Sequence, residues 1–213
     1  MAQTRYPIPA ERYRCEIEVK HSRFITTVVS TDTPDAALDF ISQIKQEFPD
    51  ATHNCWAYLI GPPGSTDRIG LSDDGEPHGV AGKPMLTTIQ HSRLGDITVV
   101  VTRYFGGTKL GKGGMVKAYT LAVKTALEQL TMTEKIDWVA LSLHFDYQFL
   151  DSIERLLPQF EVVLIEKQFA EKIYLQLKLP EENCADLCTR LTDLTAGQIE
   201  LISDQNSAQI DKD

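Results

Sequence analysis

Every apolar run in these 213 residues is short enough to be a single β-strand. The longest lie at 97–101 and 162–165, whereas a membrane-spanning helix needs about 20 apolar residues. Stretches in which apolar residues alternate one by one give way repeatedly to stretches in which they recur every three or four residues, which predicts β-strands mixed with amphipathic helices. With 42% apolar and 24% charged residues, the composition excludes general disorder. We therefore expect a globular α+β protein.

The cysteines and the N-terminal segment indicate a cytoplasmic protein. The four cysteines, at positions 15, 55, 184 and 188, form no Cys-x-x-Cys motif and have no histidine at metal-ligand spacing. We therefore predict reduced thiols and no metal site. Residues 1–14 lack the apolar core of a secretory signal, and we expect no contact with membranes.

The charge of the chain is unevenly distributed. Residues 1–130 hold 14 basic and 14 acidic residues, whereas residues 131–213 hold 7 basic and 16 acidic ones, which accounts for the whole net charge of −9. Such a change in composition predicts two domains with different surfaces, and we place them at 1–132 and 133–213. Because an acidic surface repels phosphates, we expect the second domain to be a poor nucleic-acid binder unless its basic residues gather on one face, and a protein is the alternative partner for it.

The second domain has a regular order of predicted elements. Strand, helix, two strands, helix and strand follow one another at 137–146, 149–157, 160–167, 172–179, 180–196 and 198–203. The order β-α-β-β-α-β is that of a ferredoxin-like fold.

The first domain is predicted to combine strands with three helices. The expected elements are a hairpin over 12–31, a helix over 34–48, a strand over 54–60, a short helix over 84–91, a strand over 96–105 and a helix over 114–130. In this last helix, Val116, Tyr119 and Val123 form an apolar stripe that should face the core. Lys117 and Lys124 are then expected on its outer face.

A basic, glycine-rich segment joins the strand over 96–105 to the helix behind it. Five of the nine residues at 106–114 are glycine, and between Asp96 and Glu128 there are five basic residues and no acidic one. Glycines let backbone N–H groups converge and a helix start adds positive partial charge, which is typical of a phosphate cradle. The alternative is a tight turn with incidental lysines. The residues predicted to bind an anion or a nucleic acid are Arg103, Gly106, Gly107, Lys109, Gly111, Lys112, Gly113, Gly114, Lys117 and Lys124.

A second segment, at 70–84, is rich in glycine, aspartate and proline. Its polar side chains can bind Mg²⁺, act as acid and base, or cap the backbone of an ordered turn, and the sequence leaves its role open. The residues concerned are Ser72, Asp73, Asp74, Glu76, His78 and Lys83.

The spacing Gly106-x-x-x-x-Gly111-Lys112 resembles a phosphate loop of nucleotide-hydrolysing proteins. In such loops the next residue is a serine or threonine that ligates Mg²⁺, but this chain has Gly113 there. We therefore predict no catalytic residue and no cofactor. An enzyme that binds a nucleotide on this loop, with Mg²⁺ held by the carboxylates at 70–84, is the alternative.

Three motifs of the chain resemble the IMPACT family. They are SRFI at 22–25, SDDGEP at 72–77 followed by Gly79 and AGKP at 81–84, and RYFGG at 103–107 followed by LG at 110–111 and GG at 113–114. The resemblance covers about residues 5–130, and the layout of the whole chain is similar to that of the bacterial two-domain members.

The resemblance implies a fold and a function. The first domain should be similar to the second domain of ribosomal protein S-five, a β-α-β sandwich, and the second domain should be ferredoxin-like. Family members are regarded as linked to translation and have no established catalytic residues. We therefore expect a non-catalytic protein that contacts RNA or the ribosome through the glycine-rich loop and its helix. The alternatives are the enzyme described above and a protein-interaction regulator that acts through the acidic domain.

Overall fold

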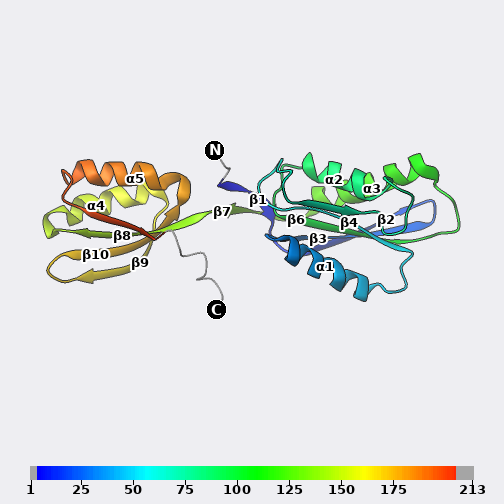
Figure 1. The fold of residues 1–213 in the computed structure, drawn as a ribbon, viewed down its shortest axis with the longest axis horizontal. Helices are drawn as coiled ribbons and strands as arrows, with labels where there is room; N and C mark the ends of the chain where they lie inside the picture. The colour runs from blue at the N-terminus through cyan, green and yellow to red at the C-terminus, as the bar shows by residue number, and fades with distance from the viewer. Residues whose placement is uncertain (1–3, 205–213) are drawn as a thin grey trace. The chain divides into compact units, whose positions relative to one another are not determined.

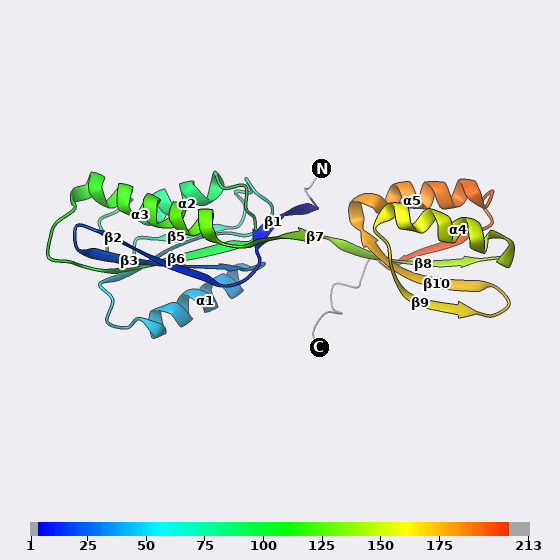
Figure 2. The ribbon, with the colours of Figure 1, turned by 180° about the vertical axis from the view of Figure 1, so that it is seen from behind.

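The computed structural model describes residues 4–204 and divides the chain into two compact units, 1–135 and 136–213. Each unit is a β-sheet covered by helices (Figure 1; Figure 2 shows the reverse side). The α+β class predicted from the sequence is confirmed. Among the helices within residues 4–204, none is long and apolar enough to cross a bilayer.

The first unit is built around a five-stranded antiparallel sheet in the order β2-β3-β6-β4-β5. Helix α1 covers one face, and α2 and α3 lie side by side on the other (Figures 1 and 2). The elements are β1 (Arg5–Pro9), β2 (Tyr13–Val19), β3 (Ser22–Ser30), α1 (Pro34–Glu47), β4 (His53–Leu59), β5 (Ile69–Ser72), α2 (Gly82–Gln90), β6 (Ile97–Tyr104), α3 (Gly111–Gln129) and β7 (Met132–Ile136), which ends at the first residue of the second unit.

The run at 97–101, which is apolar except for Thr98, forms the centre of this sheet. Because successive side chains of a strand point to opposite faces, Val99 and Val101 pack in the core beneath α2 and α3, and Val100 packs in the smaller core beneath α1. Strand β6 therefore needs apolar residues on both faces, which explains why its sequence does not alternate.

Helix α3 differs from its prediction in its start and in its buried face. It begins at Gly111, three residues earlier than expected. Tyr119 is buried as predicted, but Val116 is 36% exposed, so the prediction that Val116 faces the core is wrong. The physical reason is that alanines such as Ala118 and Ala122 supply much of the buried face, and larger side chains lie at the sides of the helix.

A buried aspartate ties both ends of the first unit to its sheet. Asp96 accepts hydrogen bonds from the Tyr6 hydroxyl at 2.8 Å and from the Gly61 N–H at 2.6 Å, and its carboxylate is 2.5 Å from the Lys135 Nζ. Tyr6 belongs to β1 and Lys135 to β7, which pair with each other in a two-stranded sheet. The Asp96 carboxylate therefore holds this small sheet against the start of β6.

We expect the protein to lose stability at alkaline pH. Burial, together with the hydrogen bond to Asp96, raises the pKa of Tyr6 from 10.0 to about 12, and burial raises the pKa of Cys55 from 9.0 to about 12. A group with a raised pKa binds its proton more tightly in the folded state. Its contribution to the free energy of unfolding is therefore fully present below the unfolded pKa and is lost as the pH rises through the folded pKa. Urea unfolding between pH 8 and pH 12 should show a falling free energy of unfolding, and Tyr6→Phe should reduce the slope above pH 10. A free energy of unfolding that stays constant between pH 8 and pH 12 would contradict the raised pKa values of Tyr6 and Cys55.

The second unit is a four-stranded antiparallel sheet in the order β11-β8-β10-β9. Helices α4 and α5 cover one face (Figure 1), and no helix within residues 136–204 covers the other. The order β-α-β-β-α-β predicted for this part of the chain is observed. The elements are β8 (Trp138–Phe145), η1 (Tyr147–Phe149), α4 (Leu150–Leu156), η2 (Leu157–Phe160), β9 (Val163–Phe169), β10 (Ile173–Pro180), α5 (Glu181–Leu194) and β11 (Glu200–Asp204).

Candidate nucleic-acid interface

The two glycine-rich segments of the sequence meet at one cavity in the first unit. This cavity, which we call the loop cavity, has a volume of about 370 Å³ and lies beside the start of α3. Segments at the start of β4, after β5, at the end of β6 and at the start of α3 contribute to its wall. The ionisable and aromatic side chains of this wall are those of His53, Glu76, Arg103, Phe105, Lys109 and Lys112.

Arg103 is an internal residue rather than a surface cation. It is 5% exposed, and its guanidinium donates to the Glu76 carboxylate, which also accepts a hydrogen bond from the Tyr119 hydroxyl at 2.9 Å. Because a buried guanidinium needs a counter-charge, Glu76 fixes it in place. The expectation that Arg103 contacts phosphate from the surface is therefore corrected: the acid-free stretch of the sequence is neutralised here by an acid from the other segment.

Four of the five glycines in the loop show different structural requirements for glycine. At Gly106 a Cβ atom would lie 1.9 Å from the His21 carbonyl oxygen, so this position requires glycine for packing. Gly107 and Gly111 have φ values of +81° and +70°, which favour glycine. Gly113 has neither reason, since a Cβ atom there would meet nothing within 4 Å. An open backbone at this point is consistent with an external group that approaches it closely.

Replacing Gly113 by alanine is therefore expected to stabilise the first unit. Gly113 lies in the first turn of a 19-residue helix, where glycine is less favourable than alanine by roughly 0.5–1 kcal/mol. Urea unfolding should show a gain of up to about this size. Gly106→Ala, which forces a side chain onto the His21 carbonyl, is the contrasting variant and should be destabilised. A loss of stability in Gly113→Ala would show that the folded protein itself needs this glycine.

The lysines of the loop remain on the surface. Lys109, Lys112 and Lys117 are exposed and form no ion pair within residues 4–204. Lys124 is exposed as well, but its Nζ lies 3.6 Å from a carboxylate oxygen of Glu128. The first turn of α3 has no side-chain cap, so its free N–H groups add to the positive potential of these lysines.

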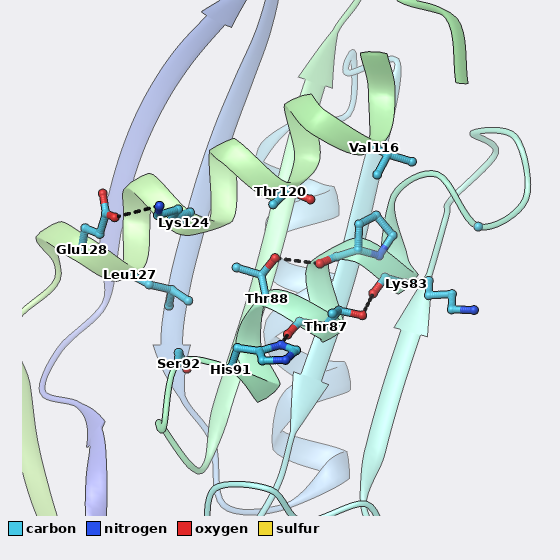
Figure 3. A pocket seen from close by; sticks show the side chains of 12 residues that line it. Lys83, Thr87, Thr88, His91, Ser92, Val116, Thr120, Lys124, Leu127 and Glu128 are labelled. Carbon is cyan, nitrogen blue, oxygen red and sulfur yellow. Dashed lines mark hydrogen bonds and ion pairs between the residues drawn. The ribbon is translucent and has the colours of Figure 1, made fainter. Parts of the chain in front are cut away.

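A groove between α2 and α3 forms a second hollow, of about 770 Å³ (Figure 3). Lys83 and Lys124 lie towards opposite ends of it, and Val116 and Leu127 supply apolar surface. The groove is thus lined by a lysine of the segment at 70–84 and by a lysine of α3, both of which the sequence singled out. The groove was not predictable from the helical pattern, because that pattern places Val116 in the core. The Thr88 hydroxyl lines this groove but donates to the Pro84 carbonyl within α2 at 2.8 Å, so its hydrogen-bond donor is already used inside the helix.

Asp73 stabilises the start of α2. Its carboxylate accepts hydrogen bonds from the backbone N–H groups of Gly79, Ala81 and Gly82 at 2.7, 3.0 and 2.9 Å. Partial burial acts to raise the pKa of Asp73, but these three donors outweigh burial and the pKa is lowered. The carboxylate thus serves as the missing N-terminal cap of α2, which has no cap from its own first residues.

The remaining polar residues of this segment also have internal partners or point outward. Asp74 accepts from Lys45 at 2.5 Å and from the Asn54 N–H at 2.7 Å, and the Ser72 hydroxyl accepts from the Asp74 N–H at 3.1 Å. His78 and Lys83 are exposed. Within residues 4–204, no group of three His, Cys, Asp or Glu residues is arranged to hold a metal ion. The segment shapes the loop cavity through these internal bonds.

Comparisons with known proteins identify relatives along the whole chain. The "Impact N-terminal domain" profile matches residues 20–127, and a "Domain of unknown function (DUF1949)" profile matches residues 143–198. The chain is 41% identical to "IMPACT family member YigZ" of Escherichia coli (strain K12), over 92% of this chain and 96% of the relative. It is 39% identical to an "IMPACT family member" of Haemophilus influenzae, over 91% of this chain and 94% of the relative. A solved structure described as a "hypothetical protein" is 39% identical and has a TM-score of 0.66, covering 96% of this chain and 99% of its own.

Proposed function

The chain belongs to the IMPACT family, and from this premise we propose that it is a translation-linked, non-catalytic protein of the cytoplasm that binds RNA or the ribosome through phosphate contacts. The contact surface consists of the glycine-rich loop at 106–114 and the exposed side of α3. We also propose the finer folds expected from the sequence: a first unit similar to the second domain of ribosomal protein S-five and a ferredoxin-like second unit.

One observation carries this proposal. Lys109, Lys112 and Lys117 stand exposed beside the uncapped start of a long helix, and no carboxylate within residues 4–204 pairs with them. Exposed cations, free N–H groups and an open glycine backbone are the three components of phosphate recognition in proteins. Arg103 takes a supporting part, because its buried pair with Glu76 fixes the end of β6 from which the loop departs.

Reversing two of these charges is expected to remove most RNA binding. In Lys109→Glu, Lys112→Glu, two attractive contacts become repulsive, so affinity for single-stranded RNA or ribosomes should fall at least about tenfold at 0.1 M salt. The dependence of log Kd on log salt should become shallower by roughly one to two units. Fluorescence anisotropy with a labelled RNA and ribosome co-sedimentation measure both quantities.

The matched control changes net charge equally at other exposed sites. Arg68 and Arg155 are exposed, form no ion pair within the described residues, and line neither the loop cavity nor the groove. Arg68→Glu, Arg155→Glu should therefore keep most of the affinity. Equal losses of affinity in both double variants would show that binding depends on net charge and not on the position of the lysines. Unchanged binding in the lysine variant would contradict the proposal.

The enzyme alternative receives less support from the geometry. The carboxylates that were candidates for Mg²⁺ already bind backbone N–H groups, a lysine or a guanidinium. Incubation with ATP or GTP and Mg²⁺ tests it directly, and turnover that is lost in Asp74→Asn would favour it.

A specific feature of the second unit favours a protein partner as a second candidate function. Strand β9 lies at the edge of its sheet, and Val163, Leu164, Ile165 and Phe169 are each about half exposed. An edge strand with apolar side chains is a surface on which another chain can add a strand. Cross-linking of the full chain in cells, compared between wild type and Ile165→Lys, tests this candidate.

A further inference from the structure

The loop cavity contains more than a phosphate site requires. Its volume of about 370 Å³ is near the lower end of ligand pockets, which span about 300–1,000 Å³. This is room for about one nucleotide. An exposed aromatic ring and a pair of hydrogen-bond acceptors line it together with the lysines. We propose that the loop cavity binds a single ribonucleotide that carries a terminal phosphate, either free or at the end of an RNA strand. This inference rests on the proposed phosphate contact of the loop.

The phosphate is bound at the side of the cavity formed by α3. Lys109, Gly111 and Lys112 line that side, and the N–H groups of the first helical turn lack a side-chain cap. A terminal phosphate carries more negative charge than a phosphate inside a strand, so it gains more from two lysines and a helix start.

The base stacks on Phe105. This side chain is 47% exposed although it follows a strand that is almost entirely buried. Its backbone N–H donates to the Thr52 hydroxyl at 3.0 Å, and the Arg103 guanidinium carbon lies 5.7 Å from the ring centroid. These contacts hold the ring in the wall of the cavity, where an exposed aromatic face can stack on a base. The neighbouring Tyr104 is tied by its hydroxyl to Asp50 at 2.8 Å.

The ribose is recognised by two acceptors in the wall. The His53 Nδ1 lies 2.8 Å from the Asp74 carbonyl oxygen. Because a carbonyl oxygen only accepts, Nδ1 is the donor in this contact, and Nε2 is an acceptor when the ring carries this single proton. Nε2 lies 3.8 Å from the Glu76 Oε2, which accepts no hydrogen bond within residues 4–204. A ribose hydroxyl can donate to either atom, and the 2′-hydroxyl is what distinguishes RNA from DNA.

The buried guanidinium also has unused hydrogen-bonding capacity. The Nε of Arg103 has no partner within the described residues, although the side chain is 94% buried. Buried donors in folded proteins rarely lack a partner. Arg103 lines the loop cavity, but its Nε is enclosed by protein atoms, so Arg103 supports the site by holding Glu76 in place rather than by contacting the nucleotide.

The experiment compares chemically defined ligands on the full chain. Single-stranded RNA of eight residues with a 5′-phosphate, a 3′-phosphate or hydroxyls at both ends is titrated by fluorescence anisotropy, and adenosine monophosphate and its 2′-deoxy form are used as competitors. One phosphorylated strand should bind about tenfold more tightly than the hydroxyl-ended strand. The ribonucleotide should compete about fivefold better than the deoxyribonucleotide. If adenosine monophosphate competes, the cavity accepts a free nucleotide. If it does not compete but a phosphorylated strand still binds more tightly than the hydroxyl-ended strand, the ligand is the end of an RNA strand.

A variant separates stacking from folding. Phe105→Leu keeps an apolar side chain and should lower affinity for the phosphorylated strand about tenfold, whereas Leu121→Ala, at another exposed apolar site in α3, should not. If Phe105→Leu is unfolded by circular dichroism, the ligand comparisons on the wild type still decide. Equal affinity for all three RNA strands would overturn the proposal that the cavity binds a terminal nucleotide. If that binding is also lost in Lys109→Glu, Lys112→Glu, the proposed function still stands. No binding of any RNA by the wild type would overturn both.

Discussion

Glu76→Ala is expected to lower the free energy of unfolding of the first unit by about 3–5 kcal/mol, the usual cost of removing one partner of a buried ion pair. The Glu76 side chain is 3% exposed and that of Arg103 is 6% exposed, so each charge is largely shielded from water and depends on its partner for compensation. The Tyr119 hydroxyl loses its acceptor at the same time. Urea unfolding at pH 7 measures the loss.

Two companion variants show whether the cost is that of an unpaired charge. Glu76→Gln keeps a hydrogen-bond acceptor and should lose less than Glu76→Ala. The double variant Glu76→Leu, Arg103→Met removes both charges and should recover part of the stability, because no uncompensated charge remains. Asp67→Ala, at an exposed acid, should change stability by less than about 0.5 kcal/mol. A loss below about 1 kcal/mol in Glu76→Ala would mean that water reaches the guanidinium.

Asp96→Ala is expected to have the second largest effect, a loss of about 3 kcal/mol or more. The Asp96 side chain is 2% exposed, and its removal leaves the Tyr6 hydroxyl, the Gly61 N–H and the Lys135 amine without their acceptor. Because these groups belong to separate segments, the variant should also loosen the two-stranded sheet of β1 and β7. Hydrogen exchange should accelerate at β1 before it does so at β3.

The side-chain chemistry of Asp96 can be checked by replacement. Asp96→Asn keeps one acceptor oxygen but loses the charge that pairs with Lys135, so it should lie between the wild type and Asp96→Ala. Uniform acceleration of exchange throughout the first unit would show that Asp96 contributes to global stability alone and does not act as a local clamp.

The order of elements was predictable because period-two and period-3.6 patterns are local properties of the sequence. They located β6 and α3 and the β-α-β-β-α-β order of the second unit to within a few residues. The patterns did not locate β1 and β7, which are short and are held by the Asp96 clamp between positions 90 and 39 residues apart. A local pattern carries no information on such contacts.

The residues of the candidate interface were predictable only in part. Their types and spacing identified the glycine-rich loop, and the structure does place Lys109 and Lys112 on the surface beside a helix start. That Arg103 is buried and paired with Glu76, 27 residues earlier, depends on how β6 and the segment after β5 pack together. The exposure of Phe105 likewise depends on where β6 ends. Pairings between distant segments decide which cations of a basic stretch reach solvent.

The close approach of Gly106 to His21 makes the glycine-rich loop dependent on a distant turn. Lys20 and His21 form the hairpin between β2 and β3 with φ values of 49° and 64°, and the Gly106 N–H donates to the Ser22 hydroxyl at 3.2 Å. The backbone at 20–22 therefore packs directly against the start of the loop and restricts its conformation. Substitutions in this hairpin are therefore expected to change the conformation of the loop, although the hairpin lines neither the loop cavity nor the groove.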